Sequence, residues 1–320
     1  AQIVWNLRDF EVQADSTPIV HESISFDHVG EIYAKGGTNN VEQGGTDGLR
    51  RLRIPSPIKG KYLTKKRAAP MPQAELFALN NLEIANTTGN LVHSLGEIKF
   101  CFGRGSLVKL LEITDKKISS HYKKDIRLRL TKRIHSDNVY YIVEDTEQWT
   151  VSPEYGHSVA DLVTQVNEGY EEWYHYVYHV VKLEAHDVAP PLSFLLRNEV
   201  DAVDRSQENL HVEIKSHNYH HPPDMMHYAY CVLTGQTAGL YIVARRPLGK
   251  SSNVETARML DRNDLKSGGR VERYLRSLSV VKKLLSEVYT SMLHYSASEA
   301  YLEHKVPQLY ESAQITLKIK

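Results

Sequence analysis

The chain has 320 residues and a formal net charge of zero, with 39 Lys plus Arg against 39 Asp plus Glu. Its hydrophobic content of 41% is enough to bury a sizeable core, which excludes disorder as the main state. No run reaches the roughly 18 apolar residues of a membrane span, and the N-terminus has no secretory pattern, so we expect a soluble, intracellular protein without a membrane partner. Two cysteines, Cys101 and Cys231, exclude a disulfide framework and a cysteine zinc site.

Charge is segregated along the chain despite the balanced total. Residues 1–133 hold 21 basic and 14 acidic side chains, residues 134–201 hold 2 and 13, and residues 202–320 hold 16 and 12. The first part contains a run of basic side chains with no acid among them: Arg50, Arg51, Arg53, Lys59, Lys61, Lys65, Lys66 and Arg67. Such a run is typical of contact with a polyanion, with a solvated loop as the alternative.

The first half of the chain contains a predicted loop, two strands and a helix. Residues 36–48 are rich in Gly and Asn, so we expect a mobile loop or an unpaired insertion there. Residues 126–134 alternate apolar and basic side chains, and residues 139–143 are β-branched and aromatic, which predicts neighbouring strands. Ser158 can cap a helix, and apolar residues at helical spacing from Val159 to Val181 predict that it continues to there.

The second half predicts further strands and helices. Strands are expected at 193–203 and 210–216 and again at 240–245. Pro222-Pro223-Asp224 predicts the start of a helix that Gly235 ends, and a long amphipathic helix is expected near Val271 to Leu293. Because strands and helices alternate, we expect a mixed α/β fold, with mixed β-sheets flanked by helices and residues 1–320 in a single domain.

Two acidic triplets carry the chemistry that the sequence suggests. The first is Glu199-Val200-Asp201, and Glu213-Ile214-Lys215 begins 12 positions after its aspartate. Alternation along a strand places the two outer residues of each triplet on one face and the apolar middle residue on the other. If the strands pair, three carboxylates and one ammonium group converge.

Clustered carboxylates repel one another unless a cation lies among them, and oxygen ligands select Mg²⁺ or Mn²⁺. Such an ion can activate water and neutralise a phosphodiester transition state, and the pattern is the core of the PD-(D/E)xK nucleases. The alternative is a structural ion pair between Glu213 and Lys215.

An upstream segment, Arg104 to Leu111 (RGSLVKLL), completes an ordered set of motifs. With this segment and both triplets, the chain resembles the decapping exoribonuclease (DXO) family of RNA 5′-end quality-control enzymes from about Phe102 to about Arg246. The resemblance implies a PD-(D/E)xK-like nuclease core with a divalent metal, Mg²⁺ or Mn²⁺. It implies that Asp201, Glu213 and the main-chain carbonyl of Ile214 bind the metal. Glu199 would bind the metal directly or through water, or act on the attacking water.

The resemblance also implies how substrate is bound. Lys215 would hold the scissile phosphate or its nucleophile, and Arg104 with the adjacent Gly105 would contact the RNA near its 5′ end.

One motif departs from the family pattern. Gly169-Tyr170-Glu171-Glu172-Trp173 occupies the place of the Gly-aromatic-x-x-Glu motif, and Trp173 stands where the family has a metal-binding glutamate. On the predicted helix, Glu172 is displaced from that position by about 100°, and we keep it, beside Glu171, as a candidate replacement. The departure resembles the fungal cytoplasmic branch, whose members lack pyrophosphohydrolase activity.

The expected protein is a metal-dependent hydrolase that releases an unmethylated cap as a capped dinucleotide and then degrades RNA from 5′ to 3′. We expect RNA 5′ ends as its partner, no obligate protein partner, and a cytoplasmic location, with the nucleus as the alternative. One alternative function is an RNA-end binding protein that stimulates a separate exonuclease. Another is a DNA nuclease with the same core.

Two histidines have a spacing that can bind zinc. His175 and His179 lie four residues apart on the predicted helix. Their aromatic neighbours favour packed or surface histidines, so we assign no metal to them.

Overall fold

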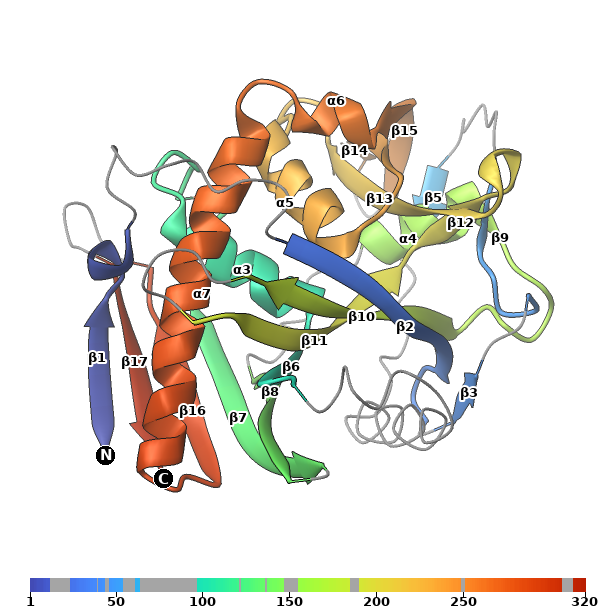
Figure 1. Ribbon diagram of the computed structural model, residues 1–320. Helices are drawn as coiled ribbons and strands as arrows, with labels where there is room; N and C mark the ends of the chain where they lie inside the picture. The colour runs from blue at the N-terminus through green and yellow to red at the C-terminus, as the bar shows by residue number, and fades with distance from the viewer. Residues whose placement is uncertain are drawn as a thin grey trace.

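Two β-sheets, with helices packed against them, make up the described part of the molecule (Figure 1). The structure is a computed structural model. It describes residues 1–11, 24–38, 40–43, 46–53, 61–63, 97–120, 122–135, 137–146, 155–184, 190–248, 251–306 and 313–320.

Ten of the described strands form the first sheet. Its spatial order is β1-β17-β16-β7-β8-β6-β11-β10-β2-β3. The sheet is mixed, because β6 runs parallel to both β8 and β11 while the other neighbours are antiparallel. The strands are β1 (Gln2–Asn6), β2 (Ile24–Lys35), β3 (Val41–Gln43), β6 (Phe100–Gly103), β7 (Ile126–His135), β8 (Asn138–Asp145), β10 (Trp173–Leu183), β11 (Leu192–Val200), β16 (Glu299–His304) and β17 (Gln314–Ile319).

The second sheet contains seven of the described strands, in the order β5-β15-β14-β13-β12-β4-β9. It is also mixed, since β13 runs parallel to β14 and antiparallel to β12. Its strands are β4 (Arg51–Leu52), β5 (Lys61–Leu63), β9 (Thr164–Gln165), β12 (Ala202–Asp204), β13 (Leu210–Asn218), β14 (Gly239–Leu248) and β15 (Ser251–Asp261). Only Asp201 separates β11 from β12, so the chain passes from one sheet to the other at this residue.

Two of the described α-helices, α5 and α6, begin at side-chain caps. Asp224 caps α5 by accepting a hydrogen bond from the main-chain N–H of Met226 (2.8 Å), and Asp261 caps α6 in the same way. The α-helices are α3 (Arg104–Thr114), α4 (Tyr155–Val163), α5 (Met225–Gly235), α6 (Arg262–Lys266) and α7 (Arg270–His294). Short 3-10 helices cover Leu7–Phe10 and Arg205–Gln207. Among the described helices, none has the length and apolar character needed to cross a membrane.

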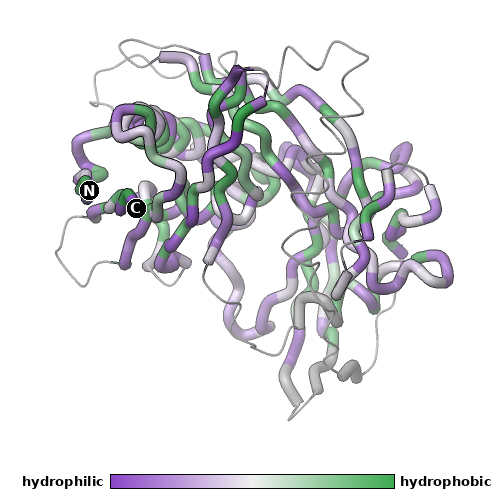
Figure 2. Tube along the Cα trace, turned by 90° about the horizontal axis from the view of Figure 1, so that it is seen from below, coloured by the Kyte–Doolittle hydropathy of each residue, from purple (hydrophilic) through white to green (hydrophobic). Residues whose placement is uncertain are grey.

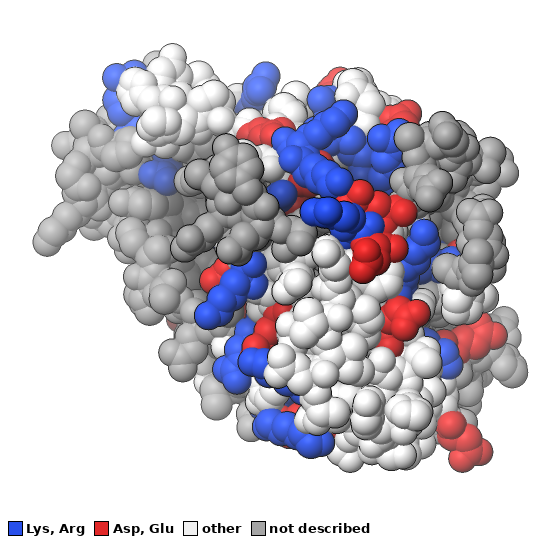
Figure 3. Space-filling view, turned by 90° about the vertical axis from the view of Figure 1, so that its left-hand side faces the viewer, with Lys and Arg blue, Asp and Glu red and all other residues white. Residues whose placement is uncertain are grey.

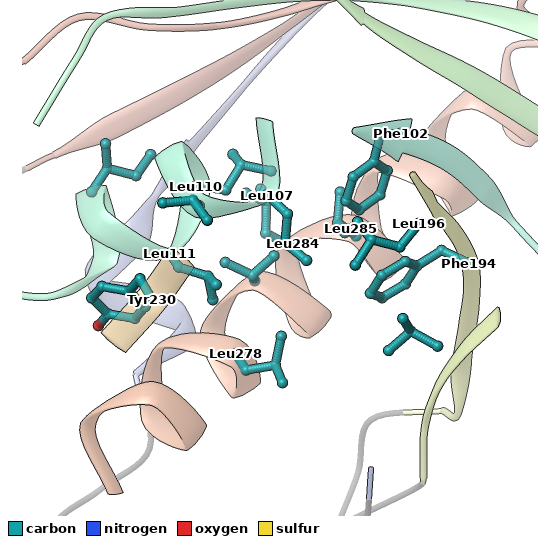
Figure 4. Packing of buried hydrophobic residues seen from close by; sticks show 14 of the residues in the cluster. Phe102, Leu107, Leu110, Leu111, Phe194, Leu196, Tyr230, Leu278, Leu284 and Leu285 are labelled. Atoms are coloured by element: carbon teal, nitrogen blue, oxygen red, sulfur yellow. The ribbon is translucent and has the colours of Figure 1, made fainter. Parts of the chain in front are cut away.

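The main hydrophobic core lies where α3, α5 and α7 pack against the first sheet. Figure 4 shows Leu284 and Leu285 of α7 between the leucines of α3 and the aromatic side chains of β6 and β11. Phe102 and Phe194 stack with ring centroids 4.9 Å apart, and both are buried. This packing fixes α3 against β11, so the start of α3 is held near the end of that strand.

The two chain ends meet at one edge of the first sheet. β1 pairs antiparallel with β17, with Gln2 opposite Lys318, and Figure 2 shows the N- and C-termini close together. The predicted strands at 126–134 and 139–143 are confirmed as the antiparallel pair β7 and β8, and the predicted helices at 224–235 and 271–293 are confirmed as α5 and α7.

The predicted helix from Ser158 to Val181 is wrong beyond its first turns. α4 ends at Val163, and residues 173–183 form β10, a strand paired with β2 on one side and β11 on the other. Both faces of β10 are covered, so its buried residues include neighbours such as Val180 and Val181. A strand buried on both faces has an almost continuous apolar run, which also satisfies helical spacing, and its β-branched and aromatic residues favour the strand.

The glycine-rich stretch 36–48 is not wholly unpaired, because Val41–Gln43 forms β3 against β2. Within the basic run, Arg50 is buried, and its guanidinium donates to Asp161 (3.1 Å) and to the main-chain carbonyl of Glu171 (2.9 Å). Arg50 therefore stabilises the fold, and the interpretation of this residue as a polyanion contact is wrong. Lys59, Lys65, Lys66 and Arg67 lie outside the described residues.

The visible surface does not reproduce the charge segregation of the sequence. In Figure 3, acidic and basic side chains lie next to one another on the face shown. Ion pairs join neighbouring strands of the first sheet, including Arg127 with Glu303 (3.2 Å) and Lys320 with Glu299 (2.7 Å). Residues far apart in the sequence therefore compensate one another's charge once the sheet forms.

We predict that Leu284→Ala lowers the free energy of unfolding by about 2–5 kcal/mol, because it leaves a cavity in the main core. Urea denaturation followed by circular dichroism measures the loss. Leu293→Ala is the matched control on the same helix, since Leu293 is 44% exposed, and it should change stability by less than about 1 kcal/mol. Equal losses in the two variants would contradict this account of the core.

Candidate active site

The two acidic triplets lie side by side where the chain changes sheets. Glu199 is on β11, Asp201 is the residue between the sheets, and Glu213 and Lys215 are on β13. β12 pairs antiparallel with β13, and the main-chain N–H of Ile214 donates to the Asp201 carboxylate at 2.8 Å. The predicted strand pairing is confirmed, and it brings the carboxylates of Asp201 and Glu213 into one site.

The apolar middle residues anchor both triplets. Val200 is 4% exposed and Ile214 is 7% exposed, so each middle side chain points into the protein. The acidic residues therefore lie on the opposite face of each strand, as the alternation of side chains requires.

Glu213 is completely buried and forms two ion pairs. Nζ of Lys215 lies 2.8 Å from one carboxylate oxygen, and Nη1 of Arg104 contacts the other. From the sequence, a structural ion pair between Glu213 and Lys215 is the alternative to a metal site, and this ion pair is present. The resemblance implies that Arg104 contacts RNA, but in this structure its guanidinium pairs with Glu213.

Arg104 is positioned by three elements that meet at this point. It is the first residue of α3, directly after Gly103 at the end of β6. A Cβ atom at Gly235, the last residue of α5, would lie 3.2 Å from Cδ of Arg104 and 3.1 Å from Nδ2 of Asn198. The packing is so close that only a glycine leaves Arg104 undisturbed. By contrast, a Cβ atom at Gly105 would meet no described atom within 4 Å, so the backbone at the start of α3 is open.

The electrostatics of the two buried carboxyl groups differ. Burial raises the pKa of Asp201 to about 7, helped by the negative charges of Glu213 and Glu199. Burial acts in the same direction on Glu213, but the charges of Arg104 and Lys215 outweigh it and lower the pKa of Glu213 to about 2. Glu213 is thus ionised and compensated, whereas the raised pKa of Asp201 lets a proton compete with a cation for this group near neutral pH.

Lys215 keeps its charge at neutral pH. Burial alone would lower the pKa of its ammonium group, but the ion pair with Glu213 raises that pKa above the ordinary value. Lys215 can therefore bind a phosphate oxygen as a cation, and it is not suited to take up a proton as a general base. The neighbouring thiol of Cys231 stays neutral, since burial raises its pKa.

The donor set fits a hard divalent cation. The carboxylates of Asp201 and Glu213 lie near the cations Arg104 and Lys215, and the negative charge of Glu199 acts on Asp201. Burial is the main cause of the raised pKa of Asp201, and the negative charges of Glu213 and Glu199 add to it. Carboxylate and main-chain oxygens are the ligands that Mg²⁺ and Mn²⁺ prefer.

No described contact joins a carboxylate of the motif around Trp173 to the site of Asp201 and Glu213. Trp173 begins β10 and packs beside Tyr33, Leu49 and Val203, and its indole N–H donates to the main-chain carbonyl of Gly169 at 3.1 Å. Its neighbours Glu171 and Glu172 are both exposed. The helical displacement assumed for Glu172 is wrong, because this residue precedes a strand.

Sequence reasoning missed two residues that belong to the site. Asn198 is 1% exposed, and its amide donates to the main-chain carbonyl of Gly235 at 3.0 Å. Arg197 lies over the ring of Tyr176, with 5.0 Å between the guanidinium carbon and the ring centroid, and burial lowers its pKa to about 10. Arg197 and Asn198 lie just before Glu199 on β11. Two polar residues inside an otherwise apolar strand could have identified them as part of the site.

Comparisons with known proteins establish the fold. No protein-family model matches the chain, and no curated protein matches it. The structure is similar to that of Rai1 from S. pombe, with a TM-score of 0.68 and 12% identity over 100% of both chains. It is also similar to K. lactis Dxo1 in complex with manganese, with a TM-score of 0.63 and 12% identity over 100% of this chain and 98% of that one.

A third solved structure extends the comparison. Scheffersomyces stipitis Rai1, in complex with (3′-NADP)⁺ and a calcium ion, matches with a TM-score of 0.61 and 12% identity over 100% of this chain and 92% of that one. The expected α/β fold with mixed sheets flanked by helices is therefore confirmed.

We predict that Mn²⁺ binds more weakly as the pH falls below about 7, because the metal and a proton compete for Asp201. The affinity should fall by about tenfold per pH unit below that value and level off above it. Isothermal titration calorimetry measures it. Asp201→Asn should bind Mn²⁺ weakly at every pH, and Glu287→Gln, on the exposed face of α7, should behave like the wild type. A wild-type affinity independent of pH between about 6 and 8 would contradict the prediction.

Proposed function

We propose that this chain is a divalent-metal-dependent nuclease of the decapping exoribonuclease family, which releases an unmethylated RNA cap as a capped dinucleotide and degrades the RNA from 5′ to 3′. The observation that carries the proposal is the meeting of Asp201, Glu213 and Lys215 at the junction of the two sheets, where the charge of Glu199 also acts on Asp201. The fold shared with Rai1 and Dxo1 supports it.

Asp201 and Glu213 would hold the metal, with Glu199 and the main-chain carbonyl of Ile214 completing the protein ligands. A bound Mg²⁺ or Mn²⁺ lowers the pKa of a coordinated water and neutralises charge on the phosphate. The manganese in the K. lactis Dxo1 complex supports this choice of ion. Arg104 and Lys215 keep Glu213 ionised, so that this ligand is ready to bind.

The remaining groups would position the RNA. The ammonium of Lys215 binds the scissile phosphate, and its side chain is 30% exposed on the same side of β13 as Glu213. The open backbone at Gly105, in the first turn of α3, offers N–H groups and the positive end of the helix to a second phosphate. Glu199 accepts a hydrogen bond from the attacking water. If the scissile phosphate at Lys215 and the second phosphate at Gly105 are bound at the same time, the RNA is cleaved at a fixed distance from its 5′ end.

The choice of a 5′ end rests on the resemblance and on one ligand of a structural neighbour. Scheffersomyces stipitis Rai1 binds (3′-NADP)⁺, a dinucleotide joined through its 5′ ends as a cap is joined to RNA. A site that holds such a ligand suits a capped 5′ terminus. We place the reaction in the cytoplasm, and RNA is the only partner that the proposal requires.

We predict that the wild type with Mn²⁺ releases a labelled cap dinucleotide from unmethylated capped RNA, and that Glu199→Ala with Asp201→Ala reduces the rate by at least about a hundredfold. Thin-layer chromatography of the products measures it. Glu287→Gln is the control, because it removes a carboxylate that lies away from the site. Equal rates in the wild type and the double variant would show that the reaction occurs elsewhere, and tight RNA binding without hydrolysis would favour a binding protein.

We predict that the wild type releases pyrophosphate from triphosphate-ended RNA only slowly, because Trp173 packs against Tyr33, Leu49 and Val203 where the family has a glutamate. An enzyme-coupled pyrophosphate assay measures this beside the decapping rate of the same preparation. Pyrophosphate release as fast as decapping would overturn the role given to Trp173.

A further inference from the structure

Three strands bring a carboxylate and two imidazoles together outside the carboxylate cluster. Glu31 lies on β2, His175 on β10 and His211 on β13, and one ligand atom from each lies within 4.8 Å of the others. Nε2 of His175 is 2.9 Å from one oxygen of Glu31, and Nε2 of His211 is 3.5 Å from the other. We call these three residues the histidine–glutamate site.

A further histidine opens the site to solvent. Nε2 of His28 is 3.6 Å from the same oxygen of Glu31 that faces His211, and the His28 side chain is 56% exposed. An ion can therefore reach the site from this side, and a fourth ligand is available in the imidazole of His28 or in water. His179 packs edge-on against His28, with 5.8 Å between ring centroids, so it lies next to the site.

Two distances at one oxygen of Glu31 are close to the ligand–ligand spacing of a tetrahedral zinc centre. Zn–N and Zn–O bonds of about 2.0–2.1 Å place neighbouring ligand atoms about 3.4 Å apart. Nε2 of His211 and Nε2 of His28 lie 3.5 and 3.6 Å from one oxygen of Glu31, and Nε2 of His175 lies 2.9 Å from the other oxygen. An ion thus requires only small side-chain movements. The ionised carboxylate supplies the negative charge, since hydrogen bonds from His175 and His211 hold the pKa of Glu31 far below its usual range.

The ligands are held in place before any ion binds. His175 is 5% exposed, and its ring stacks on that of Tyr33 with centroids 4.7 Å apart and planes 24° apart. His175 is paired with Tyr33 in the ladder between β10 and β2, and His211 is paired with Val203 in the ladder between β12 and β13. Sheet hydrogen bonds therefore fix both backbones, which reduces the entropy lost when an ion binds.

The chemistry of this site differs from that of the carboxylate cluster. His211 and Glu213 are two residues apart on β13, so their side chains share a face of the strand about 7 Å apart. Glu213 has Arg104 and Lys215 beside it, whereas Glu31 has imidazoles. Imidazole nitrogen favours Zn²⁺, and oxygen ligands favour Mg²⁺ and Mn²⁺. The two sites would thus select different ions.

We propose that Glu31, His175 and His211 bind one Zn²⁺ ion, with His28 or water as the fourth ligand. The site is separate from the metal site of the proposed nuclease, and its ligand set does not depend on whether the chain cleaves RNA. The ion would tie β2 and β10 of the first sheet to β13 of the second, the strand that also carries Glu213 and Lys215. It would therefore stabilise the junction at which the carboxylates meet.

The test is Zn²⁺ titration of the metal-free full chain in excess Mg²⁺, followed by calorimetry, with Co²⁺ as a spectroscopic probe. The expected result is one Zn²⁺ per chain that Mg²⁺ does not displace, and visible absorption bands of tetrahedral Co²⁺. Glu31→Gln and His211→Ala should each weaken Zn²⁺ binding by at least about tenfold. His220→Ala, in the exposed turn after β13, is the matched control and should bind as the wild type does.

Glu213→Gln separates this proposal from the proposed function. This variant should lose Mn²⁺ binding and keep Zn²⁺, and the titration contains no RNA, so a failure to cleave RNA has no effect on it. Zn²⁺ binding lost in Glu213→Gln but kept in His211→Ala would overturn the proposal, as would no Zn²⁺ binding by the wild type.

X-ray absorption at the zinc edge identifies the ligand atoms in the wild type, so this measurement does not depend on whether a variant folds. A shell containing histidine nitrogen is expected, and an oxygen-only shell would overturn the proposal.

Discussion

The buried carboxylate of Glu213 is the constraint on which the rest of the site depends. An ionised group that is completely buried is tolerated only when opposite charges and hydrogen bonds compensate it. Lys215 supplies one charge from the same strand, and Arg104 supplies the other from the start of α3. The position of α3, and with it the packing of α5 at Gly235, is therefore tied to one acidic residue of the second sheet. Structural stability and the readiness of Glu213 to act as a ligand have the same origin.

Much of the fold could be predicted from local signals. The alternation in β7, the cap at Asp224 and the amphipathic pattern of α7 are each decided by residues close in sequence, and all three elements are present. β10 was mistaken for a helix because its environment is not local. Its two faces pack into two different hydrophobic clusters, one with Val181 and the other with Val180, so the alternation that identifies a half-buried strand is missing.

The candidate site was predictable to the same extent. Two triplets with apolar middle residues were enough to place Asp201 beside Glu213, because strand pairing follows from a short connection. The contact of Arg104 with Glu213 joins residues 109 positions apart, and spacing alone gives no access to it. Spacing also failed to identify the partners of His175. On the predicted helix its partner was His179. The strand instead brings it to Glu31 and His211.

Because the chain passes between the sheets through Asp201 alone, the first triplet tolerates no change in length, whereas the hairpin between the two triplets does. One inserted residue between Val200 and Ala202 would turn every later side chain of β12 to the opposite face, whereas the exposed tip of the hairpin at 205–209 can lengthen without altering the register. Divergent relatives should accordingly be sought with a pattern that keeps each acidic triplet contiguous and leaves the gap between them elastic. Such a pattern does not depend on overall identity, which is 12% between this chain and S. pombe Rai1.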